Sequence, residues 1–271
     1  GFGDRGYAVL LALSSMVSVS ASVIGGIRAD QTANRRQVTL LAVLSLMLGT
    51  FLMTATPGRW VFALTAALLI PVSSITFGQV FALARLAASR YPEDARDGIM
   101  AVIRALFAAP FVVVLPLWSL AFAAGSPVTA IFPVGLILSA VMLLAVLRLW
   151  PSDKAVTWED RPSGLTFRAA LAEMGRPRIA ARVLALGAVT GASTLYMAII
   201  SLVMVAEVGR GTKDVALYVG LVAGLEVPFM LALPRFTRGI GRPTLILLGA
   251  ALYALHVALL PVLAGSPLVW G

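Results

Sequence analysis

The sequence predicts an all-α protein that crosses a membrane several times. Hydrophobic residues make up 60% of the chain and charged residues only 12%, and the mean hydropathy is +0.96. A soluble domain has about a quarter of its residues charged. Apolar runs of about 20 residues recur, which is the length that an α-helix needs to cross the hydrocarbon core. The alternation typical of outer-membrane β-strands does not appear.

Eight apolar runs are candidate membrane spans. They cover residues 7–28, 38–56, 60–88, 98–123, 128–150, 180–206, 215–233 and 244–264. Pro71 lies inside the third span and predicts a kink, because proline lacks an N–H donor. The first span has small hydroxyl residues at four-residue spacing, Ser14, Ser18 and Ser22, which favours close helix packing on that face.

The basic residues predict which ends of the spans are cytoplasmic. When Lys and Arg are assigned to alternate sides, 16 fall on one side and 4 on the other, with Arg104 inside a span. The positive-inside rule makes the richer side cytoplasmic, so the first span runs from outside to inside. The net charge of +9 therefore sits in short loops rather than on one soluble face, which argues against nucleic-acid binding.

A polar stretch divides the chain into three predicted parts. Residues 1–150 form an N-terminal bundle of five spans, residues 151–179 a cytoplasmic linker with a short surface helix at 165–174, and residues 180–271 a partial C-terminal bundle of three spans. If each bundle has six helices in full, one span before the first bundle and three after the second lie outside this sequence.

The loop after the first span resembles a signature of the major facilitator superfamily. That signature is G-x-x-x-D-[RK]-x-G-[RK]-[RK], and Gly26, Asp30 and Arg35 stand at matching places, whereas Gln31 and Ala33 depart from it. The resemblance implies a gating loop at the cytoplasmic side, in which Arg groups bridge the two halves when that side is closed. The alternative is a loop that only sets the topology.

Two further stretches resemble the sugar efflux transporter family of that superfamily. One is the run Gln79-Val80-Phe81-Ala82-Leu83-Ala84-Arg85, followed after a charged loop by Arg104-Ala105, and the other is Ala223-Gly224-Leu225-Glu226-Val227-Pro228. The resemblance implies that the chain corresponds to helices 2 to 9 of twelve. An acidic residue that the family pattern can include in helix 7 has no counterpart in the run from Tyr196 to Ser201.

Two charged residues lie deep inside predicted spans. Arg104 is about 6 residues and Glu226 about 11 residues inside its span. A charge at the bilayer centre costs roughly 2.5–3.5 kcal/mol on insertion scales, so each should face a cavity or a partner. The superfamily resemblance places helices 5 and 8 together, so these two side chains could pair. Glu226 is then a candidate for proton coupling and substrate contact, or else a static brace.

Three more residues are candidate substrate contacts. Gln79 suits recognition of a hydroxyl group, or a hydrogen bond between helices. Arg85 could bind substrate or anchor the helix end by snorkelling. Tyr196 could stack on a sugar ring or serve only in packing.

The composition leaves little for catalysis or metal binding. Cysteine is absent and His256 is the single histidine, so we expect no catalytic residues, no metal site and no cofactor. The predicted function is efflux of a small sugar or glycoside by alternating access, with proton antiport, in the inner membrane. The partners would be that solute, protons and the lipid bilayer, without nucleic acid. A drug-type exporter of the same fold is the alternative, and a non-transporting membrane scaffold is a different class; an intramembrane enzyme is disfavoured.

Overall fold

The computed structural model describes residues 2–151, 160, 162–206 and 209–263. These residues are almost entirely helical, which confirms the all-α polytopic fold class. Within the described chain, seven helices are long and apolar enough to cross a membrane: 5–32, 35–55, 59–88, 95–123, 128–149, 177–197 and 212–233. The eighth predicted span corresponds to helix α11 (Arg242–Leu263), whose apolar part, Pro243–Leu259, is shorter.

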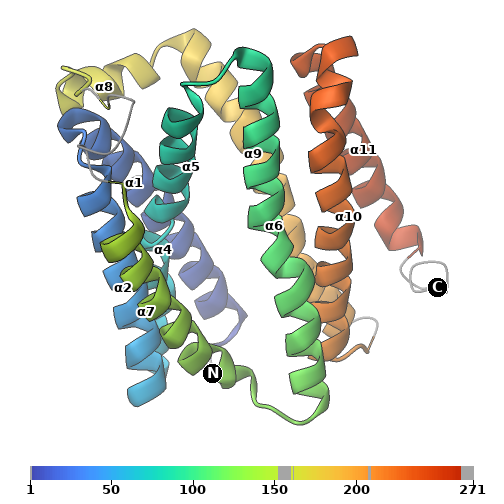
Figure 1. Ribbon diagram of the computed structural model, residues 1–271. Helices are drawn as coiled ribbons and strands as arrows, with labels where there is room; N and C mark the ends of the chain where they lie inside the picture. Colours follow the sequence, from blue (N-terminus) through green and yellow to red (C-terminus); the bar gives the residue numbers. More distant parts are fainter. Residues whose placement is uncertain (1, 152–159, 161, 207–208, 264–271) are drawn as a thin grey trace. The chain divides into compact units, whose positions relative to one another are not determined.

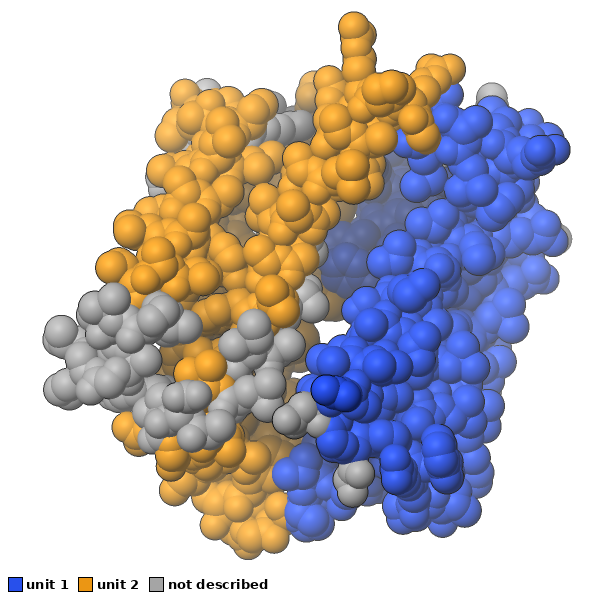
Figure 2. All heavy atoms as spheres, turned by 180° about the vertical axis from the view of Figure 1, so that it is seen from behind, with its two compact units in different colours: residues 1–92, 127–174 blue, residues 93–126, 175–271 orange. Residues whose placement is uncertain are grey.

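The chain forms two compact units, coloured separately in Figure 2. Unit 1 comprises residues 1–92 and 127–174, and unit 2 comprises residues 93–126 and 175–271. The elements of unit 1 are α1 (Asp4–Thr32), α2 (Arg35–Ala55), α3 (Arg59–Leu64), the π-helix η1 (Thr65–Leu69), α4 (Ile70–Val72), α5 (Ile75–Ala88), the 3₁₀-helix η2 (Val128–Ala130), α7 (Ile131–Leu149) and α8 (Phe167–Met174). Helix α8 confirms the short helix predicted in the linker.

Helix α2 forms the centre of unit 1. It packs against α7, α5 and η1, and Figure 1 shows it beside α7. Ala42 and Val43 are fully buried, and a cross-helix contact joins the hydroxyls of Thr50 and Ser139 at 3.5 Å. Small and hydroxyl side chains let the backbones approach closely, which is how helices associate where no water drives them together.

The third span is broken where Pro71 predicted a kink. A π-helical turn, η1, precedes the proline, and Ser73 N donates to Ile70 O at 2.9 Å instead of to Leu69 O, its partner in a regular α-helix. The carbonyl of Leu69 is left without that donor, and Ser45 Oγ of α2 donates to it at 2.9 Å. A side chain from a neighbouring helix thus satisfies the freed backbone oxygen, as the membrane interior requires.

Unit 2 contains α6 (Glu93–Ala123), α9 (Pro177–Ala206), α10 (Thr212–Gly239) and α11. Helices α6 and α10 correspond to helices 5 and 8 of the superfamily resemblance, and the expectation that they meet is confirmed by their packing. A Cβ atom at Gly220 would lie 3.0 Å from Pro116 Cδ, and one at Gly224 would lie 3.7 Å from Val112. The two helices are therefore antiparallel and closely packed. The predicted division into bundles 1–150 and 180–271 stays a prediction.

Candidate functional site: a polar pocket in unit 1

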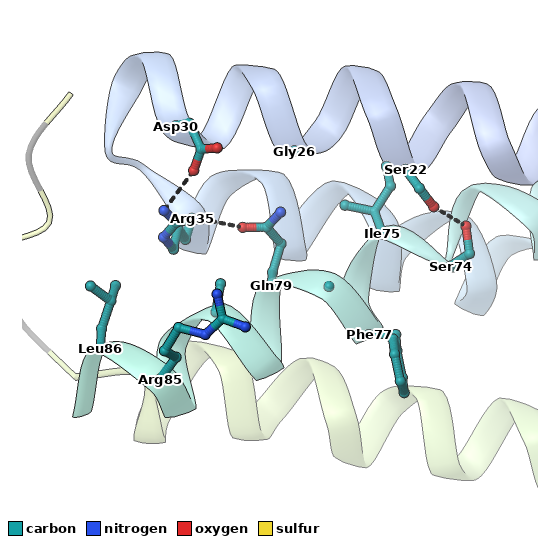
Figure 3. A pocket seen from close by; sticks show the side chains of 12 residues that line it. Ser22, Gly26, Asp30, Arg35, Ser74, Ile75, Phe77, Gln79, Arg85 and Leu86 are labelled. Carbon is teal, nitrogen blue, oxygen red and sulfur yellow. Dashed lines mark hydrogen bonds and ion pairs between the residues drawn. The ribbon is translucent and has the colours of Figure 1, made fainter. Parts of the chain in front are cut away.

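A polar pocket of about 490 Å³ lies between α1 and α5. This volume is in the range of sites that bind small molecules. The lining residues come from α1, from the start of α2 and from the third span: Ser22, Gly26, Asp30, Arg35, Ser74, Ile75, Phe77, Gly78, Gln79, Ala82, Arg85 and Leu86 (Figure 3). Five residues predicted from sequence, in the gating loop and in the run from Gln79 to Arg85, meet in this pocket.

A tight loop places Arg35 at one end of the pocket. Ala33, just after the end of α1, has the left-handed φ of 50°, and Asn34 caps the start of α2 by accepting a hydrogen bond from Gln37 N at 3.1 Å. Left-handed backbone is the conformation that glycine adopts most readily, which accounts for the glycine in the superfamily signature where this chain has Ala33. The next two arginines are then oriented differently. Arg36 donates to Leu147 O at the end of α7 at 2.8 Å, whereas Arg35 points into unit 1.

The Arg35 guanidinium lies between two carboxylates and an amide. Nη2 donates to Asp30 Oδ1 at 2.7 Å and to Asp160 Oδ1 at 3.2 Å, and Nη1 donates to Gln79 Oε1 at 3.2 Å. Nε lies 2.7 Å from Asp160 Oδ2, as an ion pair without the geometry of a hydrogen bond. The Arg35 side chain is 13% exposed and Gln79 is 4% exposed. Such charge-assisted contacts on a largely buried, planar group fix its orientation.

The predicted linker folds back onto this loop. Asp160 reaches Arg35, Ser163 N donates to Asp30 O at 2.8 Å, and Gln31 Nε2 donates to Leu165 O at 2.9 Å. Three contacts thus attach Asp160, Ser163 and Leu165 to the end of α1 and the start of α2. The predicted role of Arg35 as a bridge between the two halves stays a prediction, because these partners all belong to unit 1.

Serine hydroxyls form the other end of the pocket. Ser74 Oγ donates to Ser18 O at 3.2 Å and lies 2.9 Å from Ser22 Oγ. Since the proton of Ser74 is used on the Ser18 carbonyl, Ser22 is the donor between the two hydroxyls, and the remaining lone pairs can accept from a ligand. The packing predicted for the serine face of the first span is confirmed by these contacts with the third span.

Free space lies beside two glycines between the two ends of the pocket. A Cβ atom at Gly26 or at Gly78 would meet nothing within 4 Å, so both glycines border free space. Arg85 extends along α5 beneath Gln79 (Figure 3). Among the described residues, Arg85 has no ion-pair partner. The pocket therefore combines hydroxyl, amide and guanidinium groups with a single aromatic ring, Phe77.

One curated protein is similar to almost the whole chain. It is named "Putative sugar efflux transporter", from Deinococcus radiodurans, and is 30% identical over 277 residues, covering 96% of this chain and 67% of that protein. This chain belongs to the sugar efflux transporter family. No family model matches the chain, and no solved structure matches it. Family membership makes it a multi-pass membrane transporter that binds a small-molecule substrate.

The other residues predicted for this transporter's site lie in unit 2. Arg104 on α6 and Glu226 on α10 are both exposed, and no ion pair joins them in the described structure. The packing register gives the reason. Gly224 of α10 packs against Val112 of α6. Because the two helices are antiparallel, Glu226 lies at the level of about position 110 of α6, which is six residues from Arg104. That offset is about 9 Å along the helix axes, and Glu226 lies on the opposite side of α10 from Gly224.

Tyr196 belongs to a hydrogen-bonded aromatic cluster of unit 2. Its hydroxyl lies 2.7 Å from Tyr218 Oη and 3.0 Å from His256 Nε2, and its ring meets the ring of Tyr253 edge-on at 6.1 Å between centroids. His256 is thus hydrogen-bonded within its helix bundle. Within the described residues, no group of three or more His, Asp or Glu side chains could hold a metal ion.

Sequence reasoning missed three contributors to the pocket and its hydrogen-bond network: Asp160, Ser22 and Ser74. Asp160 belongs to a polar linker with several charges, and no local pattern distinguishes it from the others. The sequence predicts only helix packing for Ser22 and does not single out Ser74. The four-residue spacing of Ser14, Ser18 and Ser22 indicates a polar helix face, and Ser22 on that face also lines the pocket.

Proposed function

We propose that this chain is a proton-coupled transporter of the major facilitator superfamily that exports a small sugar or glycoside across the inner membrane by alternating access. The observation that carries the proposal is the pocket in which Gln79, Arg85 and Arg35 meet the serine pair. Hydroxyls, an amide and a guanidinium are the groups that pair with the hydroxyls of a sugar. The name of the similar protein and the loop containing Gly26, Asp30 and Arg35 support it.

The pocket groups would act together on one sugar. Gln79 and Arg85 donate to ring or hydroxyl oxygens at one end, and the oxygens of Ser22 and Ser74 accept from hydroxyls at the other. The glycines at positions 26 and 78 leave room for the ring between these ends. The proposal assigns no catalytic residue and no cofactor.

Proton coupling is assigned to Glu226. Its carboxylate lies within the α10 span, has no ion-pair partner among the described residues, and is followed after one residue by Pro228. A charge at that depth is costly unless water or a proton compensates it. A carboxylate whose proton affinity differs between two states couples proton movement to a conformational change.

The test is export from proteoliposomes loaded with a radiolabelled methyl glucoside and exposed to a pH gradient. Gln79→Ala should weaken glucoside binding by about tenfold, the effect of one hydrogen bond. Glu226→Gln should bind the glucoside but lose pH-driven export. A Glu226→Gln protein that exports at the parental rate refutes the coupling assignment, and parental binding by Gln79→Ala refutes the pocket assignment.

A drug-type exporter is the second candidate of the same fold. Phe77 is the one aromatic side chain among the residues that line the pocket, which favours a hydroxylated ligand over a flat hydrophobic cation. A competition experiment distinguishes a sugar exporter from a drug-type exporter. A lipophilic cation such as tetraphenylphosphonium that displaces labelled glucoside, or that is exported in its place, would favour the drug-type function.

A further inference from the structure

The linker contributes a carboxylate to the pocket's hydrogen-bond network. Asp160 lies 125 positions from Arg35 in the chain, and its side chain is 22% exposed. Its two oxygens contact the Nε and Nη2 side of the guanidinium, at 2.7 Å and 3.2 Å. Asp30 also accepts from Nη2, so Nη1 is the nitrogen left to reach Gln79.

This arrangement decides which end of the Gln79 amide faces the ligand. A guanidinium donates and never accepts, so the Gln79 atom bonded to Arg35 is the carbonyl oxygen Oε1. The amide nitrogen Nε2 must then point away from Arg35, and Figure 3 shows it directed toward the stretch of α1 that contains Gly26. Turning the amide over would bring two donors together, at a site where the side chain is only 4% exposed.

We infer that Asp160 is a specificity-determining positioning residue, which holds Arg35 so that Gln79 presents its amide NH₂ group to the pocket. This end of the site then selects a ligand oxygen that accepts a hydrogen bond and discriminates against a group that can only donate. The inference rests on the proposed sugar-binding function and adds Asp160 to the residues that shape the binding site.

Asp160 has a different role from Asp30 in this network. The Asp30 side chain is 57% exposed and contacts one nitrogen of Arg35, whereas Asp160 spans two nitrogens and is less exposed. A contact with two atoms of a planar fork fixes its rotation, and a contact with one atom does not. Removing Asp160 leaves the guanidinium with Asp30 and Gln79 but without the carboxylate that spans Nε and Nη2, and the Gln79 amide loses its fixed orientation.

The experiment compares deoxy and deoxyfluoro sugars by calorimetry on the purified protein in nanodiscs. Methyl glucoside is bound first, followed by analogues in which each hydroxyl in turn is replaced by hydrogen or by fluorine. Fluorine accepts weakly and cannot donate, so at the position facing Gln79 the fluoro analogue should bind more tightly than the deoxy analogue. In Asp160→Asn that preference should vanish, and methyl glucoside should bind about tenfold more weakly.

Gln31→Ala is the matched control. It removes the other side-chain attachment of the linker, the bond from Gln31 to Leu165 O, and leaves Arg35 with all its partners. The preference for fluorine should persist in this variant. In a Gln79→Ala background, Asp160→Asn should not further change the affinity of the fluoro analogue relative to the deoxy analogue. Both residues act through the Gln79 amide, so their effects should not add.

Several outcomes overturn the inference. Asp160→Asn with the parental preference refutes it, and so does a parental protein that binds methyl glucoside but prefers fluorine at no position; in both cases the proposed function stands. If neither methyl glucoside nor methyl galactoside binds, the proposed function fails and the inference fails with it. If Asp160→Asn does not fold, Arg35→Lys tests the same role, because lysine keeps the positive charge but lacks the planar guanidinium. A retained preference for the fluoro analogue in Arg35→Lys refutes the positioning role.

Discussion

Two adjacent glycines of α1 allow a sharp test of the packing in unit 1. A Cβ atom at Gly25 would lie 2.8 Å from Ile75 Cγ2, 3.0 Å from Cδ1 and 3.1 Å from Cγ1, whereas one at Gly26 would meet nothing within 4 Å. Gly25→Ala should therefore destabilise the protein relative to Gly26→Ala, although both changes are the same and lie on the same helix.

The comparison cancels the shared contribution of helix propensity. Alanine is favoured over glycine in a helix by about 1 kcal/mol, and both variants gain this amount. Overpacking costs about 1–3 kcal/mol and applies at Gly25 alone. The expected difference in unfolding free energy is about 2 kcal/mol. For a chain of this size, 1 kcal/mol shifts the melting temperature by about 2–4 °C, so Gly25→Ala should melt roughly 4–8 °C below Gly26→Ala.

The assay is thermal unfolding in detergent, followed by the fluorescence of the five tryptophans. Ile75→Ala removes all three atoms that the new methyl group would strike, so it should cost less in the Gly25→Ala background than alone. The cycle of single and double variants measures that coupling directly. Equal melting temperatures for the two alanine variants, or additive effects of Gly25→Ala and Ile75→Ala, would refute the close contact between α1 and α5.

Three further predictions concern the loop, the second unit and the topology. Ala33→Gly should raise the melting temperature by about 2–4 °C, because it relieves a left-handed alanine that costs about 1 kcal/mol; a decrease would contradict the tight loop. Gly220→Ala should lower the melting temperature, because its methyl group would strike the proline ring of α6, whereas Gly224→Ala should be tolerated. A lower melting temperature for Gly224→Ala than for Gly220→Ala would mean a different register between α6 and α10. In this cysteine-free chain, Arg59→Cys and Ser89→Cys should react with a membrane-impermeant maleimide from opposite sides of oriented vesicles; labelling from one side would exclude a span between them.

The spans could be predicted from sequence because hydropathy is a local property. Each apolar run of about 20 residues must be helical in a bilayer, and all eight predicted runs coincide with helices. The break at Pro71 was predictable as a kink, but the π-helical turn before it depends on a hydroxyl from α2 that no local pattern specifies.

The pocket was predictable only in part. The loop with Asp30 and Arg35 and the run ending in Arg85 carry a family resemblance, and both line the pocket. Asp160 could not be found, because its role follows from a linker that folds back over 125 positions. The depth of Arg104 and Glu226 in their spans predicts a pairing, but charge and depth do not specify the register of two helices. Glycine and proline contacts set that register here.

The bond from Ser45 to the carbonyl of Leu69 has a consequence for how relatives of this chain should vary. The hydroxyl on α2 and the break in the third span stabilise each other, because an aliphatic residue at position 45 would leave a bare carbonyl in hydrocarbon. The two features should therefore be inherited together. Relatives that lack a small hydroxyl residue at position 45 should also lack the proline at position 71, and those that keep the proline should keep serine or threonine at position 45.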